Sequence, residues 1–154
     1  MIKFNVISKN PRWKNYIKNP DTYINRQISK LNQNQKKYKN KSIICTLLLS
    51  ENKEIKKLNK KFRNKDQITD ILSFPSLDKK RLKKKLKNEK EIYLGDIIIN
   101  LNKIKFKKNI KKFQLEFNKL WIHGLVHLFG YDHKNDKDFL TMLKIEKKFL
   151  SYLN

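Results

Sequence analysis

The sequence HGLVHLFGYDH, residues 123–133, contains all three histidines of the chain and two of its three glycines. His123 and His127 are four residues apart in a segment without proline, so a helix places both imidazoles one turn apart on the same face. Gly130 allows this helix to end, because glycine tolerates the left-handed conformation that many helix C-termini adopt. The turn after Gly130 can then bring His133 back toward the other two rings.

Three imidazoles with an open fourth position form the ligand set of a catalytic zinc site, whereas structural zinc sites are closed by four protein ligands. A lone histidine on an apolar helix is usually a core residue, but three at this spacing favour a metal site. We therefore expect one Zn²⁺ ion per chain, bound by His123, His127 and His133. The order also resembles the zincin helix, but Gly124 stands where metallopeptidases carry their general-base glutamate. A metallopeptidase is therefore the less favoured interpretation.

The helix that carries the first two histidines is predicted to start near Phe113 and to lie at the centre of the core. Its residues are apolar on nearly every side, which is typical of a buried helix. These apolar residues are Leu120, Trp121, Ile122, Leu125, Val126, Leu128 and Phe129. A metal site on such a helix has the rigid support that catalysis needs.

Strand and helix patterns alternate along the rest of the chain. The continuous apolar run at Ile43–Leu49 is typical of a strand covered on both faces. Further strands are predicted at Met1–Ser8, Asp70–Phe74 and Glu91–Asn100, and further helices at Asp21–Asn34, after Ser50, at Asn102–Lys112 and at Asp136–Leu153. At 154 residues these elements predict one domain, residues 1–154, with an α+β (α/β-like) fold: a mixed sheet of about four strands packed with about five helices.

The segment Lys79–Lys90 is the most basic part of the chain, with eight positive residues against Glu89. A solvated loop or hairpin tip explains it at least as well as a dedicated RNA contact does. The sequence leaves these two interpretations open.

The formal net charge of the whole chain is +24, which favours a polyanionic partner such as RNA. The excess is nearly all lysine, however, and a genomic base-composition bias can produce it without selection for binding. The four arginines, Arg12, Arg26, Arg63 and Arg81, are more informative, because lysine cannot reproduce the planar, bidentate guanidinium. Glycine is also scarce, since average usage predicts about eleven. We therefore expect the three glycines to lie where a side chain does not fit.

Cys45 is the only cysteine, so it cannot form an intramolecular disulfide and is predicted to be a small core residue in a reducing compartment. The first residues lack the long apolar segment of a signal peptide, and no apolar stretch approaches eighteen residues. These features predict a cytoplasmic protein that does not enter a membrane.

Three motifs give the chain a family resemblance from about residue 43 to the C-terminus. Besides the histidine stretch, they are NKKFRNKDQITDILSFP at residues 59–75 and LGDI at residues 94–97. In this order they resemble the YbeY endoribonucleases, the bacterial rRNA maturation factors, whose hallmark is an HGxLHLxGYDH-type stretch. Val126 stands where the family commonly has leucine, and Asn118-Lys119-Leu120-Trp121 replaces the charged or histidine-rich residues that often precede the motif. Neither difference touches an expected metal ligand.

The resemblance implies a single-strand-specific metallo-endoribonuclease that acts in rRNA processing at the small-subunit 3′ end and in ribosome quality control. Its partners would be single-stranded RNA or rRNA and the ribosome or its small subunit. Zinc-bound water, with its pKa lowered to about 7, would attack the phosphodiester. The main alternative is a non-catalytic RNA-binding ribosome assembly factor with a structural zinc.

Five further residues are candidates for the site. Arg63 is expected to be catalytic by clamping the scissile phosphate, although a surface salt bridge would also explain it. Asp132 is expected to orient a ligand imidazole. Glu146, within an apolar helical stripe, is expected to pair with the metal loop unless it tilts to solvent. Asp70 and Asp96 are weaker candidates for such supporting roles, because strand-end carboxylates are more often structural.

Overall fold

The computed structural model describes residues 1–154 and contains one four-stranded sheet. The strands, in the sheet order β1-β2-β4-β3, are β1 (Ile2–Ser8), β2 (Ser42–Ser50), β4 (Glu91–Asn100) and β3 (Ile71–Pro75). β1, β2 and β4 are parallel, and β3 is antiparallel to β4. The prediction of a mixed sheet of about four strands is therefore confirmed.

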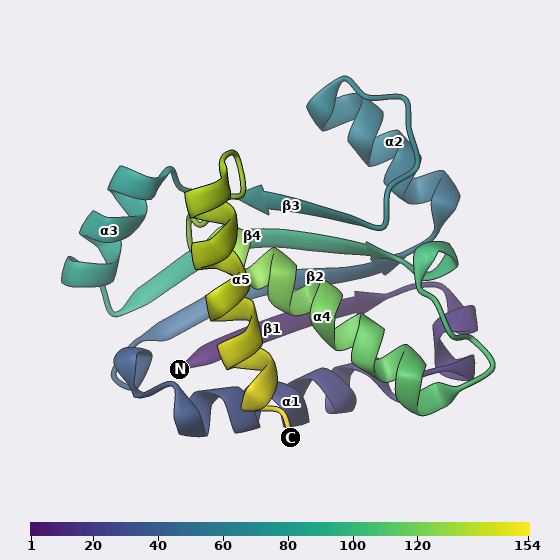
Figure 1. The fold of residues 1–154 in the computed structure, drawn as a ribbon, viewed down its shortest axis with the longest axis horizontal. Helices are drawn as coiled ribbons and strands as arrows, with labels where there is room; N and C mark the ends of the chain where they lie inside the picture. The colour runs from purple at the N-terminus through teal and green to yellow at the C-terminus, as the bar shows by residue number, and fades with distance from the viewer.

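Five α-helices pack on this sheet, which is the number predicted. They are α1 (Pro20–Asn34), α2 (Asn52–Arg63), α3 (Lys79–Asn88), α4 (Ile110–Leu128) and α5 (Asp136–Ser151), with short 3₁₀ helices η1 (Pro11–Asn15), η2 (Lys36–Tyr38) and η3 (Leu101–Lys103). Figure 1 shows α4 crossing the sheet, with α5 beside α4 and α1 along the β1 edge. Residues of α1, α4 and α5 form the large core with β1, β2 and β4, whereas α2 packs in a smaller cluster with β3 and β4.

α4 is the central helix because its second half is buried on nearly every side. Trp121, Ile122, Leu125 and Val126 are fully buried. Gly124 faces the sheet: a Cβ atom there would lie 2.8 Å from Cγ2 of Ile97 on β4. The absence of a side chain at this position therefore lets α4 approach the sheet closely, as the scarcity of glycine predicted.

Three local predictions were wrong, each because a tertiary contact or a cap decided the structure. The segment Lys79–Lys90 contains α3 rather than a loop, since Asp78 caps the Arg81 amide and the leucines of the helix pack on the core. The segment Asn102–Lys112 is not one helix: it contains η3 and a turn with Phe106 at φ 62°, and α4 begins only after its cap, Asn109.

The third wrong prediction concerns β2, which is fully packed on one face only. Its odd-numbered residues from Ile43 to Leu49 are buried, whereas Ile44, Thr46 and Leu48 are half-buried on the opposite face. α2 covers only part of that face. The continuous apolar run in the sequence therefore does not correspond to a strand covered by helices on both faces.

None of the helices combines the length and the apolar composition that a membrane span requires.

Candidate metal centre and its cleft

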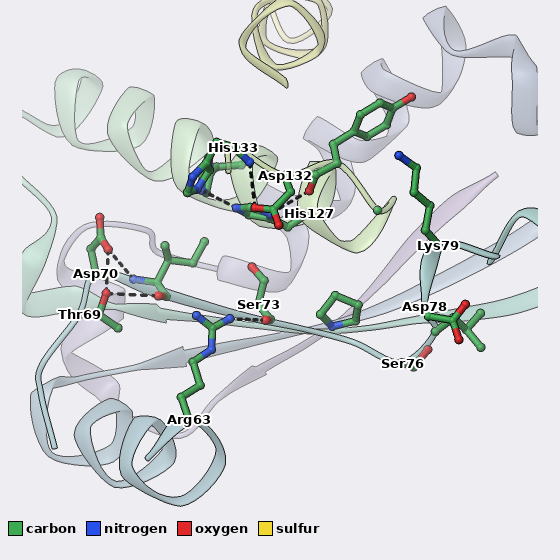
Figure 2. A pocket seen from close by; sticks show the side chains of 16 residues that line it. Arg63, Thr69, Asp70, Ser73, Ser76, Asp78, Lys79, His127, Asp132 and His133 are labelled. Atoms are coloured by element: carbon green, nitrogen blue, oxygen red, sulfur yellow. Dashed lines mark hydrogen bonds between the residues drawn. The ribbon is translucent and has the colours of Figure 1, made fainter. Parts of the chain in front are cut away.

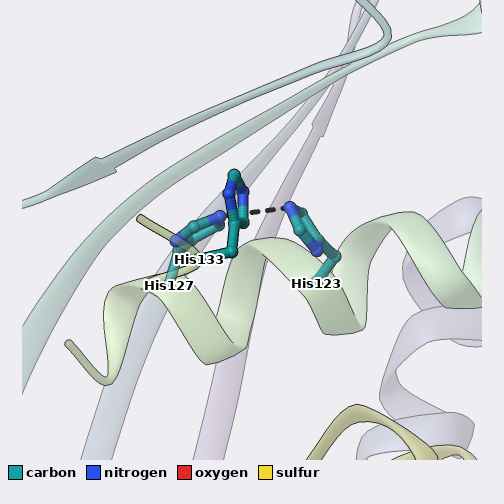
Figure 3. A group of neighbouring side chains, drawn as sticks. All are labelled: His123, His127 and His133. Carbon is teal, nitrogen blue, oxygen red and sulfur yellow. Dashed lines mark hydrogen bonds between the residues drawn. The ribbon is translucent and has the colours of Figure 1, made fainter. Parts of the chain in front are cut away.

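The three histidines of the chain converge on one point at the end of α4. Each of His123, His127 and His133 offers one ring nitrogen, and the three nitrogens all lie within 4.8 Å of one another. In Figure 3 the first two rings rise from α4, and the loop that follows brings His133 over them. The three histidines could therefore bind a metal ion, as their spacing predicted.

Hydrogen bonds fix which nitrogen of each helical histidine faces the centre. Nδ1 of His123 lies 2.7 Å from Oε1 of Glu146 on α5, and Nδ1 of His127 lies 3.0 Å from the carbonyl oxygen of Tyr131. Because a carboxylate and a carbonyl only accept, both Nδ1 atoms carry the proton and donate. The Nε2 lone pairs therefore both point into the centre, the arrangement found in metal-ligating histidines.

The donor set fits a cation. The Nε2 atoms of His123 and His127 lie 3.1 Å apart, and two lone pairs facing each other at this distance repel unless a positive charge lies between them. Burial, and secondarily the charge of His123, lowers the pKa of His127. This shift favours the neutral imidazole, which is the form that binds a metal.

The loop after α4 is held in place by its own backbone and by Asp132. Gly130 has φ +83°, a left-handed conformation that favours glycine, and its amide donates to the carbonyl of His127 at 2.8 Å. Oδ1 of Asp132 accepts from the backbone amide of His133 at 2.8 Å, and this bond lowers the pKa of the Asp132 carboxyl. Asp132 thus contacts the backbone of a ligand residue, whereas the sequence predicted a contact with an imidazole ring.

The metal centre forms one wall of a cleft of about 810 Å³, and the opposite wall comes from β3 and the segments on either side of it. Arg63, the last residue of α2, lines this second wall together with Thr69, Asp70 and Ser73. Figure 2 shows this wall facing His127, Asp132 and His133 across the cleft. Residues more than fifty positions apart in the sequence therefore share one cavity.

Arg63 is anchored by its side chain to the strand beside it. Its Nη2 donates to the carbonyl oxygen of Ser73 at 2.8 Å, and its guanidinium lies 5.5 Å from the ring centroid of Phe74. Arg63 is not a member of any ion pair in the structure, so the salt bridge considered as an alternative is not formed. The remaining guanidinium donors are free to bind an anion in the cleft.

The two weaker carboxylate candidates lie on different sides of the sheet. Asp70 lines the cleft, where Oδ1 accepts from the Ile71 amide at 2.9 Å. Asp96 lies on the opposite face and accepts from the Tyr93 hydroxyl at 2.5 Å. A bulge in β4 explains this, because Ile44 pairs with Tyr93 but Cys45 pairs with Gly95. The extra residue reverses the alternation of side chains, so Asp96 points away from the metal centre.

Sequence reasoning missed several residues of the cleft. Ser73 and Ser76 lie within or just after a recognised motif, but nothing in their type marked them as cleft residues. Lys79, at the start of α3, also lines the cleft. It belongs to the basic segment that we interpreted from sequence as a loop or hairpin tip, and no sequence pattern indicated that its first residue lines the cleft.

Comparisons with known proteins identify a family, related sequences and a related structure. The family model described as "Endoribonuclease YbeY" matches residues 9–154. A protein from Pelagibacter ubique (strain HTCC1062) named "Endoribonuclease YbeY" is 42% identical over 155 residues, which cover 99% of this chain and 97% of the relative. A protein of the same name from Thermodesulfovibrio yellowstonii is 42% identical over 64 residues, 40% of each chain. The solution structure of TM1509 from Thermotoga maritima superposes with a TM-score of 0.61 at 26% identity, covering 99% of this chain and 89% of that one.

Proposed function

Because this chain belongs to the YbeY endoribonuclease family, we propose that residues 1–154 form one metal-dependent endoribonuclease domain that hydrolyses single-stranded RNA. The observation that carries the proposal is the cleft itself. Three convergent imidazoles form one wall, and a guanidinium with free donors forms the other. Phosphodiester hydrolysis needs both a Lewis acid and a cationic phosphate clamp, so this pair of walls suits that reaction.

The metal we assign is zinc, one ion per chain, held by His123, His127 and His133. When bound, Zn²⁺ supplies Lewis acidity for a phosphoryl oxygen and a source of hydroxide near neutral pH. Around it, Glu146 holds the Nδ1 proton of His123, and the Tyr131 carbonyl holds that of His127. These two acceptors keep both Nε2 atoms directed at the centre, which is how supporting groups orient metal ligands.

Arg63 is the catalytic residue we assign to the substrate. With Nη2 bonded to the Ser73 carbonyl, the guanidinium plane is fixed, and its other N–H groups bind two oxygens of the scissile phosphate. Charge develops on those oxygens in the transition state, so a preorganised bidentate donor stabilises the transition state more than the bound substrate. Asp132 and Asp70 act as positioning residues, since each holds a backbone amide of its own wall. Asp96 has no role in this cleft.

The RNA we propose as substrate is ribosomal. The family resemblance supports maturation of the small-subunit rRNA 3′ end and ribosome quality control, with the ribosome or its small subunit as partner. We place this activity in the cytoplasm, a proposal supported by the free, buried thiol of Cys45.

The packing around Gly124 further disfavours the peptidase alternative. Gly124, at the position of the peptidase general base, packs against Ile97 and Ile71. A glutamate there would enter the core between α4 and the sheet instead of reaching a substrate. The site therefore lacks the peptidase base and the space for it.

The test is a cleavage assay with purified, zinc-loaded protein whose metal content is measured by elemental analysis. We expect cleavage of single-stranded RNA, little cleavage of the same sequence in a duplex, no cleavage of casein, and loss of activity after chelation. Zinc at one equivalent with no RNA cleavage would instead support the assembly factor with a structural zinc. Casein cleavage would support a peptidase.

A further inference from the structure

The most basic helix of the molecule begins at the wall of the metal cleft. Lys79, its first residue, lines the cleft together with Asp78 and Leu77. A Cβ atom on Gly130 would lie 3.5 Å from Cγ of Lys79, so the first turn of α3 packs against the loop that carries His133. Figure 2 shows Lys79 in the same cavity as His127 and Asp132. The ten residues of α3 extend about 15 Å from this point, at 1.5 Å per residue.

The positive charges of α3 divide into a paired group and an unpaired group. Arg81 pairs with Asp78 at 3.3 Å, and Lys85 pairs with Glu89 at 2.9 Å. The other five cationic residues of the helix are exposed and form no ion pair or hydrogen bond through their side chains: Lys79, Lys80, Lys83, Lys84 and Lys87.

The five unpaired lysines form one continuous stripe along the helix. At 100° per residue they fall within about 140° of one another, whereas the two paired residues and the two leucines lie outside that arc. Like charges three and four residues apart repel and weaken a helix. A stripe of this kind gains stability when a polyanion runs along it and its counterions are released.

On these grounds we propose that the lysine stripe of α3 binds the phosphate backbone of single-stranded RNA on one side of the scissile phosphate. The inference rests on the proposed function, because the metal cleft defines where the strand is cut. The stripe begins at the cleft wall, so a strand leaving the cleft over Lys79 meets the other four lysines in sequence. The contacts are to phosphates, so they add affinity and register without reading base sequence.

The buried side of α3 argues against a membrane as the partner. Basic amphipathic helices that bind membranes insert their apolar side into the lipid. Here Leu82 is only 2% exposed and belongs to the main core, and Leu86 packs against the same core. The helix therefore has no free apolar face to insert, and only its charged stripe is available to a ligand.

Two matched variants test the proposal. One replaces Lys80, Lys83, Lys84 and Lys87 with glutamine, leaving Lys79 in the cleft unchanged. The control replaces Lys14, Lys18, Lys108 and Lys111, which are also exposed and unpaired, and which lie in and around η1 and the start of α4, away from α3 (Figure 1). Both variants lose four charges, and glutamine preserves helix propensity. A third variant with arginine at the four α3 positions keeps the charge, and melting temperatures verify folding.

The binding assay uses a long single-stranded RNA, with a chelator present to prevent cleavage, at several salt concentrations. The cleavage assay uses zinc and an RNA strand too short to extend beyond the cleft. For the α3 glutamine variant we expect at least about tenfold weaker binding at low salt. A plot of log affinity against log salt concentration should also have a shallower slope for this variant. Each lost phosphate contact lowers the slope by about 0.7, so the loss of four contacts would lower it by about 3. Cleavage of the short strand should stay within about twofold of the parent, and the control and arginine variants should bind as the parent does.

Equal losses in the α3 and control variants would overturn the proposal, because bulk charge alone would then explain binding. Unchanged binding by the α3 variant would overturn it as well. So would loss of binding to phosphatidylserine vesicles with RNA binding intact, which would make α3 a membrane contact. A parent protein that cleaves no RNA would refute the proposed function, while the binding comparison with chelator would still decide the role of α3.

Discussion

The two walls of the cleft are built in opposite ways. On the metal wall, two of the three imidazoles sit on a buried helix, and each of those two has its outer nitrogen bonded to a fixed acceptor. On the facing wall, Arg63 is an exposed residue at the end of α2, held by one hydrogen bond and by the ring of Phe74. On the first wall, the outer nitrogens of both helical histidines already have hydrogen-bond partners. On the second wall, most N–H donors of Arg63 have no partner within the protein.

This difference fits the two tasks that we propose for the walls. A metal ion needs its ligands in place before it binds, because misplaced imidazoles lose both affinity and selectivity. A phosphate clamp acts best when its donors are oriented but unoccupied until charge develops on the substrate. Changes to the metal wall should therefore alter metal content, whereas changes to the arginine wall should alter the chemical step alone.

The largest effect is expected from removing a ligand of the metal wall. His127→Ala leaves two imidazoles, and a site that loses one of three protein ligands should lose most of its zinc and essentially all cleavage. Elemental analysis of the His123→Ala, His127→Ala and His133→Ala proteins checks this, with melting temperatures to verify folding. Full zinc occupancy in all three would contradict the assignment of the site.

The next effect tests the facing wall. Arg63→Lys keeps the charge but loses the planar fork, so single-turnover cleavage should fall by about 10²–10³-fold, the usual loss on removal of one transition-state donor. Zinc content, melting temperature and RNA affinity should stay near those of the parent, because the interaction forms mainly in the transition state.

The matched control is Arg12→Lys, since Arg12 pairs with Glu51 on the surface at 3.2 Å. It should cleave at the parental rate. If Arg63→Lys cleaves normally, Arg63 has no part in the chemistry. If it cleaves poorly and also melts early, the bond to the Ser73 carbonyl is structural instead.

The metal wall was predictable from sequence to a greater degree than the arginine wall, for a local reason. The spacing of His123 and His127 and the turn at Gly130 are encoded within eleven residues. Helix geometry therefore pairs the first two rings, and the local turn brings His133 to them. The central helix and the mixed sheet also followed from periodicity. Glu146, expected near the metal loop, lies against His123; whether it tunes the metal stays a prediction.

Features that depend on register or on distant packing could not be predicted. The position of Asp96 depends on one extra residue in β4, which alternation alone does not reveal. α3 depends on Leu82 and Leu86, four residues apart, whose burial stabilises a helix that its charge composition disfavours. The anchor of Arg63 is a backbone carbonyl on a neighbouring strand, and no side-chain pattern encodes a carbonyl contact.

The smallest effect is expected from Glu146→Gln, which changes the hydrogen-bond partner of the ligand His123 and leaves all three imidazoles in place. The carboxylate accepts the Nδ1 proton of His123 at 2.7 Å with little exposure to solvent. Glutamine keeps the size and an acceptor oxygen but removes the negative charge that raises the basicity of the ring. Loss of such a supporting group typically lowers metal affinity by about 10–100-fold. Zinc competition against a chelator should show this loss, and saturating zinc should restore much of the cleavage, which it cannot do for His127→Ala.

Glu116→Gln is the matched control, because Glu116 lies on the same helix as His123 but pairs with Lys119 instead. Parental zinc affinity in Glu146→Gln would mean that the carboxylate only packs against the ring. The rigidity of the metal wall would then rest on α4 and the His127–Tyr131 bond alone.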